Sequence, residues 1–364
     1  MIVLKLKLNK IFEFNDFEID FTYPKKIVNS IIEEEHLSGR ERFRYKKAVI
    51  LMGANATGKT SLGRVLSIVF QSLEKRNSYT LREIMKEDGA SLSIDFVNKG
   101  YRLHRFTARV VDGTNTLEYI YYSSEIEKMD SYEKCVRKLT DQTTLFKKHT
   151  NDEDLFGKIN YRFSYPEIQN FLALKDVDKA DLLKTFRAVI GTLDPSLQNI
   201  EIAKELKDSF IIRRKDQEII IQEGKLLNRE LLSSGTIGGI GVAIFLASML
   251  SKEPCFYYCD EHFLYIQSNI EKRIFGIMLE RIPNNGQLIF TTHNTDMLDL
   301  NLPKHTYVFL RRVYENGVSR VSAISASDSL KRNTDSVRSA EENDVFGALP
   351  NDYLLDSLET GWVE

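Results

Sequence analysis

Cysteine is scarce in this sequence, and tryptophan is almost absent. Three cysteines and one tryptophan occur among 364 residues. Cys135, Cys255 and Cys259 show no metal-ligand spacing, which excludes the common cysteine-based metal sites. Cys255 and Cys259 lie in one apolar run, where we expect buried thiols. This cysteine usage suits a reducing, cytoplasmic environment.

Long apolar runs and an excess of charge of one sign are also lacking. The longest nearly apolar run, Ile237–Leu250, is too short to span a bilayer, so no membrane segment is expected. The N-terminus, MIVLKLKLNK, alternates with lysine and lacks a signal-peptide core. The formal net charge of −2 argues against an overall basic coat for nucleic acid, although a local basic groove remains compatible with it.

The stretch VILMGANATGKTSLGRVL contains the phosphate-binding pattern G-x-x-x-x-G-K-[ST]. An apolar run, Ala48–Met52, precedes the pattern, and apolar residues at helical spacing follow it, which is the strand–loop–helix context that the pattern needs. Backbone N–H groups of such a loop bind phosphate oxygens. Lys59 would bridge the β- and γ-phosphates of ATP, and the Thr60 hydroxyl would bind Mg²⁺. The predicted cofactor-binding residues here are Gly53, Ala54, Asn55, Ala56, Thr57, Gly58, Lys59, Thr60 and Ser61.

Two further segments place polar residues after apolar strands. CFYYCDE has the form of a buried strand that ends in two acids. Asp260 would then hold Mg²⁺ opposite Thr60, and Glu261 would act as the general base. TTHN follows the strand QLIF, so His293 would contact the γ-phosphate and orient Glu261 or the attacking water. Exposed strand ends and a structural histidine are the alternatives.

A third segment, LLSSGT, precedes a glycine-rich apolar helix. Ser233, Ser234 and Gly235 would make a second anion-binding helix start, and the simpler alternative is that Ser233 or Ser234 caps that helix. Two phosphate-binding helix starts in one chain suggest a site in which ATP lies between two copies.

The order of patterns predicts an α/β fold of the P-loop NTPase class. Alternating strands are expected at Ile2–Leu8 and Phe12–Phe21, with a short helix near Ile31–His36. Strands at 91–97, 101–111 and 117–122 would form an antiparallel β subdomain. We expect an N-terminal part of the ATPase domain at 1–124, a mainly helical inserted lid at 125–192, and a C-terminal part at 193–364.

The ordered set GANATGKTS, LSSGT, CFYYCDE and TTHN resembles the ATP-binding-cassette (ABC-type) ATPases of the SMC, RecF and OLD branch. Asn55 is typical of that branch. LDPSLQNI, LSSGT and the late FGALP are similar to compact AAA-type ATPases of phage-defence operons, including PARIS-type ATPase subunits. The resemblance implies an ABC-type ATPase head in which Asn55, Lys59 and Thr60 serve phosphate and Mg²⁺. It also implies Ser233 and Gly235 at the γ-phosphate of another copy, Asp260 at Mg²⁺, Glu261 as base and His293 as switch histidine.

The resemblance has departures. LSSGT replaces the usual LSGGQ, and HFLYIQSN after Glu261 lacks the aspartate of the usual dimer-contact loop. A Q-loop glutamine cannot be placed, because Gln71 lies on the helix of the phosphate loop.

The function implied is an ATP-hydrolysing, Mg²⁺-dependent protein that assembles with itself and controls a separate effector, a Toprim-type nuclease, in anti-phage defence. The effector is expected in trans because only about 50 residues follow the closing strands, too few for another domain. A phage protein or DNA would be the trigger. The alternative is a DNA-repair ATPase with a basic groove near Arg213, Arg214, Lys215, Arg311 and Arg312, although solvated strand ends are the simpler explanation of these residues. A transporter subunit is disfavoured by the absence of a membrane segment, and a small-molecule kinase would need neither LSSGT nor His293.

Overall fold

A six-stranded sheet forms the centre of the protein. The computed structural model describes residues 1–27, 30–75, 80–98, 100–114, 116–148, 156, 158–166, 177–197, 199–203, 209–215, 217–315, 318–332, 334–350 and 355. The first five strands of the sheet are parallel, and the last strand is antiparallel to its neighbour. In spatial order they are β10 (Tyr161–Ser164), β15 (Phe256–Asp260), β16 (Gln287–Thr291), β5 (Ala48–Met52), β17 (Tyr307–Glu315) and β18 (Val318–Ser325).

Strand β5 is buried on both faces of this sheet, which explains its continuous apolar sequence. Ala48, Ile50 and Met52 contribute to one hydrophobic core, whereas Val49 and Leu51 contribute to another. Successive side chains of a strand point to opposite faces, so one short apolar run supplies both cores.

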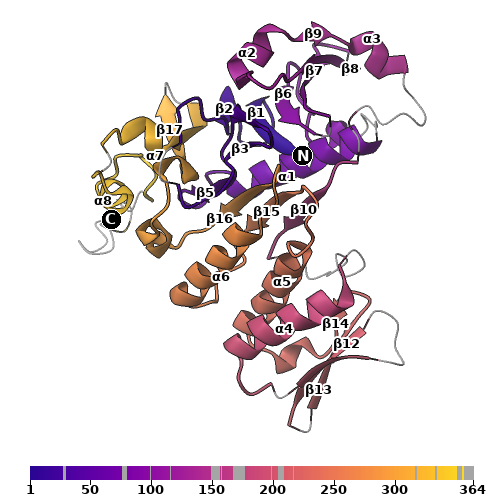
Figure 1. Cartoon of the computed structure of the whole chain (residues 1–364), viewed down its shortest axis with the longest axis vertical. Helices are drawn as coiled ribbons and strands as arrows, with labels where there is room; N and C mark the ends of the chain where they lie inside the picture. Colours follow the sequence, from indigo (N-terminus) through magenta and orange to yellow (C-terminus); the bar gives the residue numbers. More distant parts are fainter. Residues whose placement is uncertain are drawn as a thin grey trace, which may run out of the picture.

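On one face of the sheet lies helix α1 (Lys59–Lys75), with an antiparallel sheet beyond it (Figure 1). The apolar residues of α1 share a core with those of the antiparallel sheet, as their helical spacing predicts. That second sheet has the order β2 (Phe17–Asp20), β1 (Ile2–Asn9), β6 (Ser91–Val97), β7 (Arg102–Val111), β8 (Thr116–Glu125) and β9 (Thr140–Asp141). The strands predicted at 91–97, 101–111 and 117–122 are present as β6, β7 and β8, and they pair antiparallel.

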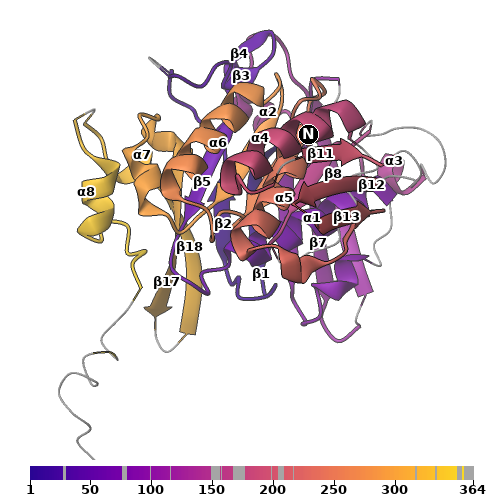
Figure 2. The ribbon, with the colours of Figure 1, turned by 90° about the horizontal axis from the view of Figure 1, so that it is seen from below.

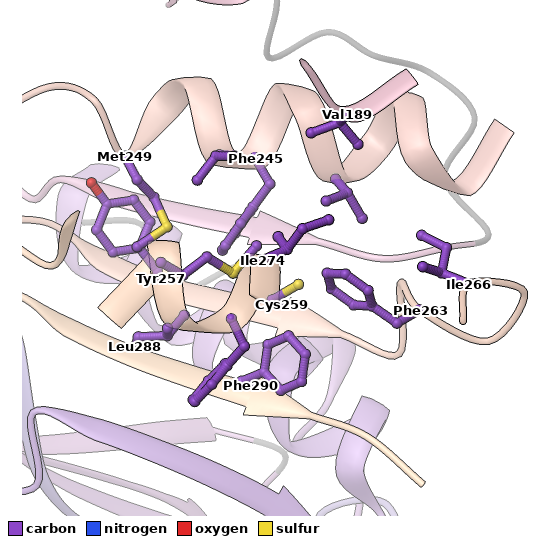
Figure 3. Close-up of a cluster of buried hydrophobic side chains, with 14 of the residues drawn as sticks. Val189, Phe245, Met249, Tyr257, Cys259, Phe263, Ile266, Ile274, Leu288 and Phe290 are labelled. Atoms are coloured by element: carbon purple, nitrogen blue, oxygen red, sulfur yellow. The ribbon is translucent and has the colours of Figure 1, made fainter. Parts of the chain in front are cut away.

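On the other face lie helices α4 (Lys179–Leu193), α5 (Ser234–Ser248) and α6 (Ser268–Arg281). Figure 3 shows the core that they share with the central sheet, in which Phe245 and Ile274 meet Tyr257 and Phe290. Helix α4 also packs on a small sheet, where Phe186 meets Phe210 edge to face. This lobe, at the bottom of Figure 1, contains β11 (Asn199–Ile202), β12 (Ser209–Arg214), β13 (Gln217–Gln222) and β14 (Lys225–Leu226).

Helices α7 (Ala326–Ser329) and α8 (Val337–Glu342) lie on the side of β17 and β18, away from the small sheet (Figure 2). Among the described helices, none combines the length and the apolar composition that crossing a membrane requires. The remaining short elements are β3 (His36–Leu37), β4 (Arg40–Arg44), η1 (Thr80–Glu83), α2 (Tyr132–Arg137), α3 (Thr143–Lys148), η3 (Arg229–Leu231), η4 (Thr295–Asp299) and η5 (Lys304–Thr306).

The short helix predicted near Ile31–His36 is wrong. The described backbone there makes bends and then the hairpin β3–β4. Tertiary contacts explain the difference, because Glu35 is buried and its carboxylate lies 2.6 Å from His305 Nε2. A charged segment for which sequence predicts a short helix thus contains a buried contact between Glu35 and His305.

The expectation of a mainly helical stretch at 125–192 is wrong at two places. The chain contributes β9 to the antiparallel sheet and β10 to the edge of the central sheet. Tyr161 and Phe163 of β10 pack against Phe70 of α1, so alternating aromatic residues favour a strand there. The helical pattern holds for α2, α3 and α4, while residues 149–155, 157 and 167–176 lie outside the described part. The lid role and the division into domains remain predictions.

A buried histidine in the antiparallel sheet predicts sensitivity to acid. His104 stacks on Phe96, and its Nδ1 lies 2.7 Å from the Tyr121 hydroxyl. Burial, aided by the positive charge of Arg102, lowers the pKa of His104 from 6.5 to about 3. Between these two pKa values, His104 is protonated in the unfolded chain but neutral in the folded protein. The free energy of unfolding therefore falls as the pH drops below about 6.5.

We expect this one group to lower the free energy of unfolding by up to about 1.4 kcal/mol per pH unit between pH 6 and 4. Urea denaturation at several pH values measures the slope. A His104→Gln variant should show a shallower slope, and an unchanged slope would contradict the assignment to His104.

Candidate functional site

The predicted phosphate loop joins β5 to α1. Gly53 and Gly58 have φ angles of +148° and +97°, which residues with side chains rarely adopt. A Cβ on Gly53 would lie 2.3 Å from the Leu310 carbonyl oxygen, and one on Gly58 would lie 2.8 Å from the Phe14 ring. Backbone conformation and close packing therefore both require glycine at these two positions.

Lys59, the first residue of α1, turns its side chain back over the loop. Its Nζ donates to the carbonyl oxygens of Gly53 at 2.8 Å and Ala54 at 3.3 Å, and it lies 3.4 Å from Glu261 Oε1. The side chain is only 4% exposed, and this burial lowers the pKa of Lys59 although Glu261 and Asp260 oppose the shift. The amino group of Lys59 is thus buried beside the carbonyl oxygens of the phosphate loop.

Asp260, at the end of β15, lies beside the loop as predicted. Its Oδ2 accepts from the Thr60 hydroxyl at 2.7 Å, and its Oδ1 accepts from the Thr291 hydroxyl at 2.8 Å. Burial raises the pKa of Asp260, and the negative charge of Glu261 adds to the shift. A nearly inaccessible carboxylate beside a hydroxyl is an arrangement that a cation would stabilise.

Glu261 follows Asp260 with a φ of +45°, a conformation rare for this residue type. Its backbone N–H donates to Thr291 Oγ1 at 3.0 Å, and its Oε1 lies 2.9 Å from His293 Nε2. Burial would raise the pKa of Glu261, but the hydrogen bond from His293 and the charge of Lys59 outweigh it, so the pKa is lowered. Glu261 is therefore ionised and aimed at Lys59 and His293.

The structure brings five of the predicted residues together. Lys59 and Thr60 follow the loop after β5, Asp260 and Glu261 end β15, and His293 follows β16. Because β5, β15 and β16 are adjacent parallel strands, their carboxyl ends meet at one edge of the sheet.

The remaining loop residues differ in exposure. Asn55 and Ala56 are exposed, whereas Thr57 is buried with its hydroxyl donating to the Ala54 carbonyl at 2.8 Å. Ser61 lies half-buried in the first turn of α1.

The segment LSSGT lies at the start of α5, and the capping alternative describes it well. The Ser233 hydroxyl accepts from the Thr236 N–H at 3.1 Å. Ser233 and Ser234 are exposed. A Cβ on Gly235 would lie 2.9 Å from the Tyr265 carbonyl oxygen, so this helix start packs against the loop that follows Glu261. These contacts do not join Ser233 or Gly235 to the phosphate loop of the same chain, and their role toward ATP stays a prediction.

Three contacts of the site were not predicted from sequence. Thr291 holds both the Asp260 carboxylate and the Glu261 backbone. Arg312, from β17, donates to the Ala56 carbonyl oxygen. The Ala348 carbonyl oxygen accepts from the Ala54 N–H at 3.1 Å. Thr291 belongs to the TTHN motif and Ala348 to FGALP, so each lies in a motif that sequence singled out, although neither contact was predicted. Arg312 depends on tertiary packing that no local pattern reports.

Comparison with known proteins places the fold. No protein-family model matches the sequence, and no curated protein matches it. Among solved structures, an SMC head bound to the C-terminal winged-helix domain of ScpA has a TM-score of 0.50 at 15% identity, with 91% of this chain and 100% of that chain covered.

Two other SMC heads are similar at lower scores. The Thermotoga maritima SMC head domain has a TM-score of 0.45 at 15% identity, covering 89% of this chain and 100% of that chain. A head domain with an extended coiled coil, bound to the C-terminal domain of ScpA derived from Pyrococcus furiosus, has a TM-score of 0.48 at 12% identity, covering 91% and 98%. By its similarity to the first of these structures, this chain has the fold of an SMC head domain.

Proposed function

We propose that this protein binds ATP with Mg²⁺ and hydrolyses it. The observation that carries the proposal is the meeting of Lys59, the Thr60–Asp260 pair and the Glu261–His293 pair at the end of the phosphate loop. A cation for phosphate, oxygen ligands for a metal and an oriented carboxylate are the groups that ATP hydrolysis requires.

The site fits Mg²⁺ through its donor set. Mg²⁺ prefers hard oxygen ligands and commonly takes one or two from the protein, with phosphate and water supplying the others. The Thr60 hydroxyl and the Asp260 carboxylate are such ligands, and they already lie within hydrogen-bonding distance of each other. When bound, the ion would neutralise charge on the phosphates.

The roles of the remaining groups follow from their contacts. Glu261 is ionised, so it can accept a proton from the attacking water. His293 holds the Glu261 carboxylate in place through the 2.9 Å contact. Lys59 would exchange its contacts with Glu261 and the loop carbonyls for phosphate oxygens, and it would counter the charge that develops during transfer.

Turnover of ATP by the purified protein, measured as phosphate release with and without Mg²⁺, tests this function. Hydrolysis that depends on Mg²⁺ and on Lys59 is expected. The absence of both ATP binding and hydrolysis would refute it.

We further propose that ATP drives self-association through the start of α5. This helix start is exposed at Ser233 and Ser234, and its backbone N–H groups could receive the γ-phosphate held by another copy. An SMC head of the same fold is bound to a separate protein, which supports a role in assembly with partners.

Substitution of Ser233 separates capping from assembly. Ser233→Ala should lower the free energy of unfolding by about 1 kcal/mol, because the cap of α5 is lost. It should also weaken ATP-dependent association, measured by light scattering. Ser233→Asp is the matched variant: its carboxylate restores the cap, but its charge repels phosphate. Association of Ser233→Asp at the wild-type level would contradict the assembly role.

The effector remains part of the proposal. We propose that the assembled ATPase controls a separate Toprim-type nuclease in anti-phage defence, as the sequence resemblance implies, with a phage protein or DNA as trigger. Co-purification with the product of the adjacent gene, with and without ATP, tests this. Full protective activity of the ATPase alone, without any bound partner, would refute it.

The alternative of a DNA-repair ATPase has less support. Arg213 is already paired with Glu201 at 2.8 Å and with Glu218 at 3.4 Å, and Arg312 is directed at the phosphate loop. The basic groups proposed for a DNA groove are thus largely committed elsewhere. Salt-dependent binding of duplex DNA that stimulates the ATPase would reverse this preference.

A further inference from the structure

A segment near the end of the chain reaches the phosphate loop and holds it from outside. The Ala348 carbonyl oxygen accepts from the Ala54 N–H at 3.1 Å. Ala54 is the second residue of the loop, directly after Gly53. We call Phe346–Ala348 the C-terminal clasp.

An aromatic stack anchors the clasp. Phe346 is 1% exposed, and its ring lies parallel to that of Phe309, with centroids 4.0 Å apart and 9° between the planes. Phe309 lies on β17 directly opposite Met52, the last residue of β5 before the loop. The anchor is therefore built on the strand next to the one that carries the loop.

The backbone around the anchor has a defined shape. The Gly347 N–H donates to the Asp344 carbonyl at 3.0 Å, and the Leu349 N–H donates to Asp344 Oδ1 at 3.2 Å. Gly347 has a φ of +62°, and a Cβ there would lie 3.3 Å from Arg311 Cδ. Two bonds to Asp344 and one left-handed glycine thus turn the Ala348 carbonyl toward the loop.

Strand β17 completes this outer wall. Leu310 brings its carbonyl oxygen against Gly53, and Arg312 donates to the Ala56 carbonyl oxygen and to Ser319. Gly53, Ala54 and Ala56 are therefore each contacted by β17 or by the clasp. Ala56 has a φ of +62°, so the loop includes a left-handed residue with a side chain that needs such support.

We propose that the C-terminal clasp is a positioning element for ATP, and that docking of Phe346 sets the affinity of the phosphate loop for nucleotide. A phosphate-binding loop must present its N–H groups in one arrangement, and ordering a mobile loop costs binding free energy. Because the clasp holds Ala54 in place before ATP binds, less ordering of the loop is needed when ATP binds. This inference rests on the proposed function, because it takes the loop to bind ATP.

Thermodynamic linkage gives the proposal a second consequence. If a docked clasp raises the affinity for ATP, bound ATP must favour docking of the clasp by the same factor. The C-terminal segment would then respond to the nucleotide state of the loop. A protein that contacts this segment would sense ATP binding without entering the site.

Removal of the anchor tests the proposal. In Phe346→Ala, equilibrium titration with a fluorescent ATP analogue should give a Kd about tenfold higher than in the wild-type protein, or about 1.4 kcal/mol. The kcat at saturating ATP should stay within about twofold. Tyr314→Ala, which removes a 74% exposed aromatic residue from β17, is the matched control and should leave Kd unchanged. If Phe346→Ala does not fold, the smaller truncation Phe346→Leu replaces it in the test. The Kd of Phe346→Leu should be higher than that of the wild-type protein, but less than tenfold higher.

Amide exchange distinguishes positioning from general stability. Exchange at the Ala54 N–H should accelerate about tenfold in Phe346→Ala, while amides in the centre of α1 should keep their protection. Unchanged Kd and unchanged exchange at Ala54 would overturn the proposal. If the wild-type protein binds the analogue and Lys59→Ala does not, an unchanged Kd in Phe346→Ala refutes the clasp proposal and leaves the proposed function intact. If the wild-type protein does not bind it, the clasp proposal and the proposed function both fall.

Discussion

We expect Glu261→Gln to hydrolyse ATP roughly a hundred- to a thousandfold more slowly than the wild-type protein, while it still binds ATP. Glutamine keeps the shape of the side chain and an oxygen that can accept from His293, but it cannot take a proton from water. The positive φ of +45° at this position is equally accessible to both residues, so folding should be preserved.

The structure also predicts the direction of the change in affinity. Lys59 lies 3.4 Å from the Glu261 carboxylate, and this contact must loosen when Lys59 binds phosphate. Removing the negative charge removes that competition, so the Kd for ATP should be equal to or lower than that of the wild-type protein. The assembled, ATP-bound state should accumulate, which light scattering would detect.

Single-turnover hydrolysis and equilibrium binding check both parts. Glu280→Gln, an exposed change on α6, is the matched control and should match the wild-type protein in each assay. Hydrolysis by Glu261→Gln at the wild-type rate would show that Glu261 is not the base. His293→Ala should cause a smaller loss, because it removes the partner that orients the carboxylate and keeps the carboxylate itself.

The elements around the site follow closely from sequence because local patterns determine them. Strand β5 is a continuous apolar run, α1 has helical spacing, and Gly53 and Gly58 occupy positions where only glycine fits. Local order of this kind needs no knowledge of distant residues. The adjacency of β5, β15 and β16 follows from the motifs at their ends, since a shared site requires the three strand ends to meet.

The regions that sequence did not predict depend on contacts between distant residues. The local sequence predicts that Glu35 belongs to a short helix. Its contact with His305, 270 residues away in the sequence, cannot be predicted from that segment. Strand β10 is short, and its pairing with β15 decides its conformation. Arg312 was grouped with solvated or DNA-binding residues, and only the register of β17 beside β5 reveals its contact with the loop.

We expect Lys59→Ala to abolish detectable ATP binding and to lower hydrolysis by at least about a hundredfold. Three losses coincide in this variant. The positive charge that would meet the phosphates disappears, the bonds that brace Gly53 and Ala54 disappear, and Glu261 loses its cationic partner.

Lys59→Met separates these effects, because methionine fills most of the buried volume without the charge. If charge is the main contribution, Lys59→Met and Lys59→Ala should be equally inactive while Lys59→Met retains more of the thermal stability. Lys75→Ala, at the exposed end of the same helix, should bind ATP normally. Binding by Lys59→Met at the wild-type affinity would mean that loop geometry, rather than the ammonium group, holds the phosphates. The site would then depend mainly on its backbone N–H groups, and the C-terminal contacts that position them would become its principal determinant.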